Sequence, residues 1–286
     1  MGEATAVLLL SCPDQPGLVA AVSDFVFRHG GNIVHAQQHI DPDDGTFFQR
    51  VEFSVDGLDL GRGEIGPAFA EVADRFGMNV DLRFRDVVTR MAILVSRQPH
   101  CLDDLLSRQR TGDLGPTEVP LVISNHPDHA EVVAFAGAAY HHLPVTPETK
   151  RDQEDAVLAL LAEHRIDLVV LARYMQVLSD TFIAAHRNRI INIHHSFLPA
   201  FSGGRPYHQA RARGVKLIGA TAHYASEELD EGPIIEQDVL RVSHRESVED
   251  LARTGQDLER LVLARAVRAH LQHRVLPHGR RTVVFD

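Results

Sequence analysis

MAILVS (91–96) is the first of four short, almost continuous apolar runs; the others are PLVISN (120–125), DLVVLA (167–172) and IINIHH (190–195). Stretches with apolar residues at helical spacing separate them, near 101–110, 128–137 and 152–164. Strands that are apolar throughout and alternate with helices are typical of a parallel sheet covered on both faces. The sequence therefore predicts a doubly wound, mostly parallel α/β domain over residues 87–286.

The C-terminal part of this predicted domain has a different pattern. KLIGATAHY (216–224) and GPIIEQDVLRV (232–242) have the composition of strands, and an amphipathic helix is expected from about Ser247 to His270. We expect these elements to complete the domain.

The N-terminal residues predict a second, smaller domain over residues 1–86. A strand is expected at 4–11, followed by a helix at 18–29 that ends at Gly30 and Gly31. Two strands, 32–40 and 46–55, are joined by the turn DPDDG. A second helix at 61–76 and a last strand at 79–85 follow. The order β-α-β-β-α-β predicts a ferredoxin-like fold. The polar stretch 86–90 is the expected boundary.

Composition and charge exclude several classes of protein. The chain has 286 residues, enough for two modest domains, and a formal net charge of −10, which argues against a nucleic-acid surface. Two cysteines, Cys12 and Cys101, fit a reducing compartment, and we expect Cys101 to be a buried apolar residue. A signal peptide and a membrane-spanning run are not evident, so we expect a cytoplasmic protein.

Polar side chains gather where the run 190–193 should end. Ligands bind beyond the carboxyl ends of strands in open parallel sheets, which places Asn192, His194 and Ser196 at a site. Asp230 follows the next strand, on a loop closed by Gly232 and Pro233. An amide, an imidazole and a carboxylate suit attack by a non-protein nucleophile on a polarised carbonyl group.

A metal-dependent hydrolase is the competing interpretation, because the chain contains 18 histidines. Zinc sites usually have closely spaced ligand pairs such as H-E-x-x-H, which the sequence lacks. The adjacent pairs 141–142 and 194–195 should point to opposite faces of a strand. We therefore expect no metal and no other cofactor.

Residues 190–235 resemble the folate-dependent formyltransferase family, through N-I-H-x-S-x-L-P at the end of a strand and a later D-x-G-P-I loop. LARYMQVLS (171–179) resembles that family's folate-binding segment, and the resemblance covers most of 91–286. It implies an α/β formyltransferase-like fold, with catalytic roles for Asn192, His194 and Asp230. The residues implied in folate binding are Met175, Gln176, Val177, Leu178, Tyr224, Ala225 and Leu229. His223 either orients Asp230 or only packs, and Ser196 is a further supporting candidate.

The segment SRQPHCLDDLL (96–106) separates two activities within this family. Members that formylate a ribonucleotide amine have a glycine-rich phosphate loop there, whereas this segment contains no glycine. Together with PYHQA (206–210), it resembles the family's deformylases. The implied reaction is hydrolysis of 10-formyltetrahydrofolate, which supplies formate for purine biosynthesis and balances the one-carbon pool. The alternatives are formyl transfer to an amine and a non-catalytic folate or amino-acid sensor.

Residues 14–38, DQPGLVAAVSDFVFRHGGNIVHAQQ, resemble an ACT domain. The resemblance implies an amino-acid effector near Gly17, Leu18 and Asn32, bound between paired modules. A domain that only joins subunits is the alternative. Both interpretations predict a homo-oligomer, either a dimer or a tetramer.

Overall fold

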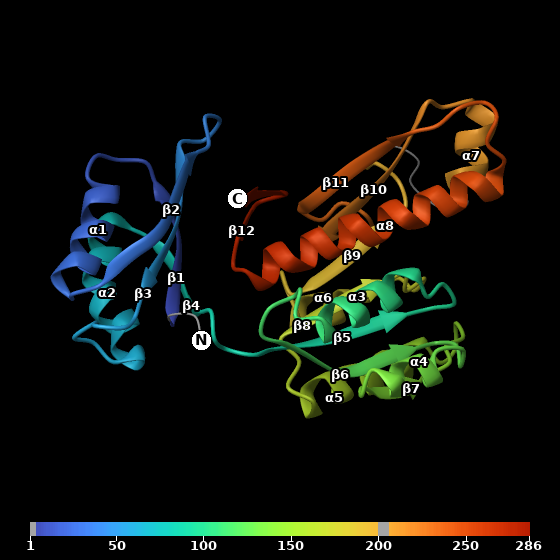
Figure 1. The fold of residues 1–286 in the computed structure, drawn as a ribbon, viewed down its shortest axis with the longest axis horizontal. Coiled ribbons are helices and arrows are strands. Elements are labelled where there is room, and N and C mark those ends of the chain that lie inside the picture. The colour runs from blue at the N-terminus through green and yellow to red at the C-terminus, as the bar shows by residue number, and fades with distance from the viewer. Residues whose placement is uncertain (1–3, 200–205) are drawn as a thin grey trace. The chain divides into compact units, whose positions relative to one another are not determined.

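The computed structural model describes residues 4–199 and 206–286, and the chain divides into two compact units (Figure 1). One unit runs to Val87 and also includes 272–276 and 283–286; the other comprises 88–271 and 277–282. The end of the chain thus clusters with the N-terminal unit, whereas the expected division gave it to the second domain. The reason is apolar burial, because Phe285 packs against Val7, Leu9 and Phe48.

The N-terminal unit has the expected order of elements: β1 (Thr5–Pro13), α1 (Leu18–Arg28), β2 (Asn32–Ile40), β3 (Thr46–Ser54), α2 (Arg62–Phe76) and β4 (Asn79–Phe84). Its sheet is antiparallel with the order β2-β3-β1-β4. The predicted ferredoxin-like, ACT-type arrangement is confirmed.

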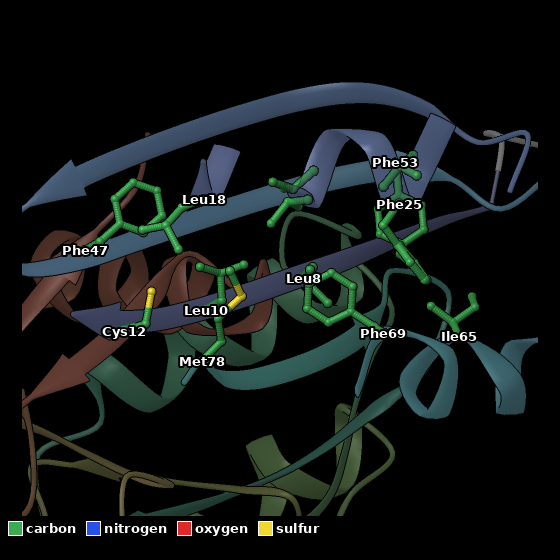
Figure 2. Packing of buried hydrophobic residues seen from close by; sticks show 14 residues of the cluster. Leu8, Leu10, Cys12, Leu18, Phe25, Phe47, Phe53, Ile65, Phe69 and Met78 are labelled. Carbon is green, nitrogen blue, oxygen red and sulfur yellow. The ribbon is translucent and has the colours of Figure 1, made fainter. Parts of the chain in front are cut away.

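The core of this unit lies between the sheet and its two helices (Figure 2). Leu8 and Leu10 point from β1 toward α1 and α2, because alternate residues of a strand face the same side. The rings of Phe25 and Phe69 join the helices edge to face, with centroids 5.0 Å apart. On α1 the buried residues are Leu18, Val22, Phe25 and Val26.

The second unit contains a seven-stranded sheet in the order β11-β10-β9-β8-β5-β6-β7. Its strands are β5 (Thr89–Val95), β6 (Thr117–Ser124), β7 (Ala139–His142), β8 (Leu168–Ala172), β9 (Ile190–His194), β10 (Leu217–Tyr224) and β11 (Ile234–Arg241). Neighbouring strands pair in parallel along the part β9-β8-β5-β6-β7 of this order. Strand β10 pairs antiparallel with both β9 and β11. The doubly wound, mostly parallel fold is confirmed.

Helices pack on this sheet: α3 (His100–Arg110), α4 (Ala130–Phe135), α5 (Lys150–Glu163), α6 (Asp180–Ala185), α7 (Pro206–Arg213) and α8 (Val248–Leu271). Helices α5 and α6 cover one set of strand side chains, which includes Leu94, Ile123 and Leu171. Helix α8 contacts α3 and strands β9, β10 and β11. A final hairpin joins β12 (Val275–His278) to β13 (Arg281–Val284).

Several of these elements were not expected from the sequence, namely β7, α6, α7, β12 and β13. Helix α6 has six residues and β7 has four, too few to display a hydrophobic period. Across residues 4–199 and 206–286, each helix is too short or too polar to cross a lipid bilayer.

Candidate active site

Strand β9 brings Asn192 beside His223. Asn192 is paired with Leu171 of β8 on one side and with His223 of β10 on the other. The amide Nδ2 of Asn192 lies 3.2 Å from Nε2 of His223, and Nδ1 of His223 lies 2.9 Å from the carbonyl oxygen of Tyr224. A carbonyl only accepts, so Nδ1 donates the hydrogen and Nε2 accepts from the amide. Burial lowers the pKa of His223, which fits this neutral ring.

Asp230 reaches the same place from the loop between β10 and β11. Its nearer carboxylate oxygen lies 3.2 Å from Nδ1 of His194 and 3.9 Å from Nε2 of His223. The hydrogen bond from His194 is the largest cause that lowers the pKa of Asp230, so this carboxyl group is ionised at neutral pH. The other nitrogen of His194, Nε2, is buried and has no hydrogen-bond partner in the described part of the chain. That nitrogen is therefore available for a further hydrogen bond.

Gly232 allows the loop that carries Asp230 to pack closely against β10. A Cβ atom at this position would lie 1.7 Å from the carbonyl oxygen of Tyr224 and 3.2 Å from Nδ1 of His223. The loop therefore lies against β10 more closely than a side chain would permit. Asp230 itself has φ 59°, in the left-handed region. The local backbone is thus adapted to hold the carboxylate beside His194.

A cavity of about 220 Å³ opens onto Asn192, His194 and Asp230. Its described lining consists of Leu171, Arg173, Tyr174, Met175, Gln176, Val177, Leu178, Ile183, Asn192, Ile193, His194, His195, His223, Ala225, Ser226, Glu227, Leu229 and Asp230. One wall is the segment after β8, where the Ser96 hydroxyl accepts from the backbone N–H of Met175 at 3.0 Å and donates to Asn125 at 2.7 Å. Mostly apolar walls with a few convergent polar groups are typical of a small-molecule site.

Most of the predicted folate-binding residues line this cavity, namely Met175, Gln176, Val177, Leu178, Ala225 and Leu229. Tyr224 does not, because its side chain is buried and its hydroxyl lies 2.7 Å from Nδ1 of His270. The side chain of Tyr224 therefore does not face the cavity, and a role for its backbone in folate binding stays a prediction. Ser196 is also buried outside the lining, and its carbonyl oxygen accepts from Thr221 at 2.8 Å.

His194 and His195 stack on one another, with ring centroids 5.0 Å apart and an interplanar angle of 29°. The expectation that adjacent histidines face opposite ways was wrong here, because β9 ends at His194 and the alternation ends with it. Burial, followed by the positive charge of Arg173, lowers the pKa of His195 to about 4. His195 is therefore neutral at pH 7.

Near the cavity, His100, Cys101 and Glu259 have possible ligand atoms within 4.8 Å of one another. However, Nε of Arg173 lies 3.4 Å from the same Glu259 carboxylate and would repel a cation. Cys101 is 1% exposed, and burial raises the pKa of its thiol well above the usual range. The chemistry of these groups fits an internal ion pair better than a metal site.

Sequence reasoning missed Arg173, Glu259 and Ser96. Arg173 directly follows the buried strand β8. A charged residue at the carboxyl end of a buried strand could have indicated a residue of the site. Glu259 lies within an amphipathic helix and Ser96 directly follows β5, so neither has a motif that marks it.

The three expected effector residues do not meet within one ACT unit. Gly17 precedes α1 with φ 96°, whereas Asn32 begins β2 beyond the other end of that helix. Helix α1, which lies between them in the chain, has 11 residues and is about 16 Å long. Leu18 is buried in the core. A small ligand that touched both Gly17 and Asn32 would need one of them from a second copy.

Comparison with known proteins assigns both units to families. The formyl transferase family matches residues 89–267, and the ACT domain family matches residues 6–65. Formyltetrahydrofolate deformylase of Synechocystis sp. is 55% identical over 285 residues, covering 100% of both chains. That of Bacillus subtilis is 49% identical, covering 98% of this chain and 93% of the relative. The crystal structure of a formyltetrahydrofolate deformylase from Pseudomonas syringae pv. tomato has a TM-score of 0.97 at 47% identity, covering 100% of this chain and 96% of that one.

A formyl transferase domain that follows an ACT domain places the chain among the proteins of the formyl transferase family. More narrowly, the chain belongs to the formyltetrahydrofolate deformylase family and is a hydrolase. The family indicated by the sequence motifs is thus confirmed.

Proposed function

We propose that this enzyme hydrolyses 10-formyltetrahydrofolate to formate and tetrahydrofolate at the cavity bounded by Asn192, His194 and Asp230. The observation that carries the proposal is the His194 ring, which is held by Asp230 through Nδ1 at 3.2 Å while its buried Nε2 has no partner in the described residues. The names of the relatives above supply the substrate class.

Asn192 and His194 stabilise the developing oxyanion in this proposal. The side-chain amide of Asn192 has two hydrogens. One is donated to His223, and the other donates to the formyl oxygen in this proposal. Protonated His194 donates from Nε2, and the carboxylate of Asp230 compensates the charge of the ring. Preorganised donors in a buried site need no reorganisation as negative charge develops.

Asp230 orients the attacking water. The oxygen of water forms a bond to the formyl carbon, and the bond from that carbon to N10 breaks. One proton lost by water passes through Asp230 and His194 to N10, and formic acid then ionises to formate. The lowered pKa of Asp230 makes it a weak base, so acceptance of the proton depends on its pairing with His194.

The folate lies along the apolar part of the cavity in this proposal. Backbone groups of 175–178 and of the loop 224–230 hold the pteridine, while Leu178, Ile183 and Leu229, which line the cavity, contact its faces. The segment 175–178 is well placed for this role because Ser96 fixes the backbone N–H of Met175. We expect no metal or organic cofactor.

Incubation with 10-formyltetrahydrofolate alone, followed by measurement of formate and tetrahydrofolate, tests the function. Equal amounts of both products support hydrolysis. Turnover only when an amine is supplied would instead identify a transferase, and folate binding with no turnover would identify a sensor. Activity retained after treatment with a chelator would exclude a metal requirement.

The released formate supplies purine biosynthesis and balances the one-carbon pool in this proposal. The ACT unit binds an amino acid between two copies of the chain, since Gly17 and Asn32 lie at opposite ends of α1. A cytoplasmic homo-oligomer follows as an expectation. Light scattering that found only monomer, with and without amino acids, would contradict the paired-module site.

A further inference from the structure

A buried ion-pair cluster centred on Glu259 lies behind the cavity. Glu259 is on α8 and is 1% exposed. It accepts from the Tyr207 hydroxyl at 2.6 Å, lies 2.8 Å from Nε2 of His100 and lies 3.4 Å from Nε of Arg173. Burial raises the pKa of Glu259, but the hydrogen bond from His100 and the charge of Arg173 outweigh burial, and the pKa is lowered. The carboxylate is therefore ionised, and groups from three other parts of the fold hold it.

The backbone is adapted to this cluster at two positions. Gly255 precedes Glu259 by one turn of α8, and a Cβ atom there would lie 2.0 Å from the Tyr207 hydroxyl oxygen. Arg173 has φ 62°, a left-handed conformation that favours glycine. Burying charges and adopting such a conformation both cost stability. A cluster retained at these costs is better explained by a role at the adjacent site than by stability alone.

The cluster reaches the wall of the cavity through Arg173. Arg173 and His195 belong to the described lining, while Glu259, His100 and Tyr207 lie behind them. The His195 ring stacks on His194 at 5.0 Å and lies 6.3 Å from the Tyr207 ring, measured between centroids. A continuous series of contacts therefore runs from the site's imidazole to Glu259. This part of the wall adjoins His194, beside which the nucleophile approaches in the proposed reaction.

We propose that Arg173, held by its ion pair with Glu259 and by the hydrogen bond that its Nε donates to Gln98 at 3.3 Å, is a specificity-determining residue that leaves room for water at the formyl carbon and excludes amine acceptors. The inference rests on the proposed hydrolysis. Water needs space for one small molecule, whereas an amine also needs space for the group that its nitrogen carries. Formyl transfer would form a bond from nitrogen to the formyl carbon and break the bond from that carbon to N10. One proton would pass from the amine to N10, giving a formamide and tetrahydrofolate.

The test replaces Arg173 by glycine and supplies glycinamide as the amine probe. Glycine suits φ 62°, so Arg173→Gly removes the side chain without imposing strain on the backbone. We expect the wild type to form almost only formate, and the variant to raise the ratio of N-formylglycinamide to formate by about tenfold or more. Added guanidinium ion should lower that ratio again by refilling the space. Arg173→Asn, which also tolerates a left-handed backbone, repeats the test if the glycine variant does not fold.

Arg165→Gly is the matched control. Arg165 also has a left-handed backbone, φ 50°, but it is exposed at the end of α5. This substitution should leave the product ratio unchanged. Formate as the only product of folded Arg173→Gly or Arg173→Asn would overturn the inference, as would ready formylation of glycinamide by the wild type. Absence of formate from the wild type without amine would instead contradict the proposed function, so the two failures are distinguishable.

Discussion

His194 is held by Asp230 through one ring nitrogen, Nδ1, at 3.2 Å, while its other nitrogen is buried at the cavity with no partner in the described residues. The two nitrogens of an imidazole are distinct, and the hydrogen bond made by one determines what the other presents. The pairing with Asp230 therefore fixes the direction in which Nε2 can donate. The same carboxylate remains close enough to orient water.

Replacing Asp230 by asparagine should lower kcat for formate release by about 100-fold or more, because the general base and the partner charge of His194 are both lost. The carboxamide has nearly the same shape, so the thermal unfolding midpoint should change little. Glu231→Gln is the matched control: this neighbouring carboxylate is exposed, pairs with Arg280 and should be dispensable. Near-normal turnover by Asp230→Asn would remove Asp230 from the mechanism.

Asn192→Ala should lower kcat by roughly 10²–10³, the usual cost of losing one oxyanion donor. The Michaelis constant should change much less, because the lost hydrogen bond is strongest in the transition state. Steady-state kinetics with 10-formyltetrahydrofolate provide both values. A large rise in the Michaelis constant with unchanged kcat would make Asn192 a folate-binding residue instead.

His223 should act through Asn192, which two substitutions can show. Gln in place of His223 can put an amide oxygen near the position of Nε2 and still accept from Asn192, whereas the shorter Asn cannot reach it. We therefore expect His223→Gln to retain about tenfold more activity than His223→Asn, since a directed hydrogen bond contributes about 1.4 kcal/mol. Equal activity of the two variants would leave His223 with a packing role only.

The sequence predicted the parts of the fold that depend on hydrophobic periodicity. The apolar run at 167–172 became β8 and the run at 190–195 contains β9, because buried parallel strands need apolar residues on both faces. The antiparallel pairing of β10 with β9 has no such local signal, since it depends on how the chain returns to the sheet. Short elements such as α6 are determined by tertiary packing, here the burial of Phe182 and Ile183.

The site was predictable where residues lie close in sequence to a strand end. Asn192 and His194 belong to one strand, and Asp230 lies on the loop that follows its neighbour. The contact between Arg173 and Glu259 could not be read from the sequence, because no local pattern relates residues so far apart. A glutamate in an amphipathic helix is ordinarily solvated, and only the packing of α8 shows that this one is buried.

Gly232→Ala should impair catalysis by displacing the Asp230 loop. The added methyl group would overlap the carbonyl oxygen of Tyr224, which is backbone and has little freedom to move. We expect a fall of about tenfold or more in kcat, since small misplacements of catalytic groups are costly. Gly63→Ala in α2 is the control, because its Cβ would meet nothing within 4 Å. That variant should keep wild-type kinetics; if Gly232→Ala does too, the loop tolerates displacement.

His195 should make the enzyme less stable as the pH falls. Its pKa is about 4 in the folded chain, mainly through burial, and about 6.5 when unfolded. The unfolded state therefore binds more protons between pH 6.5 and pH 4, and the free energy of unfolding falls as the pH is lowered through that window. His195→Phe keeps a ring between His194 and Tyr207 without the titration. Denaturant unfolding at pH 7 and pH 4.5 should show that the wild type loses about 2 kcal/mol more than the variant. Equal losses would mean that His195 does not titrate in this way.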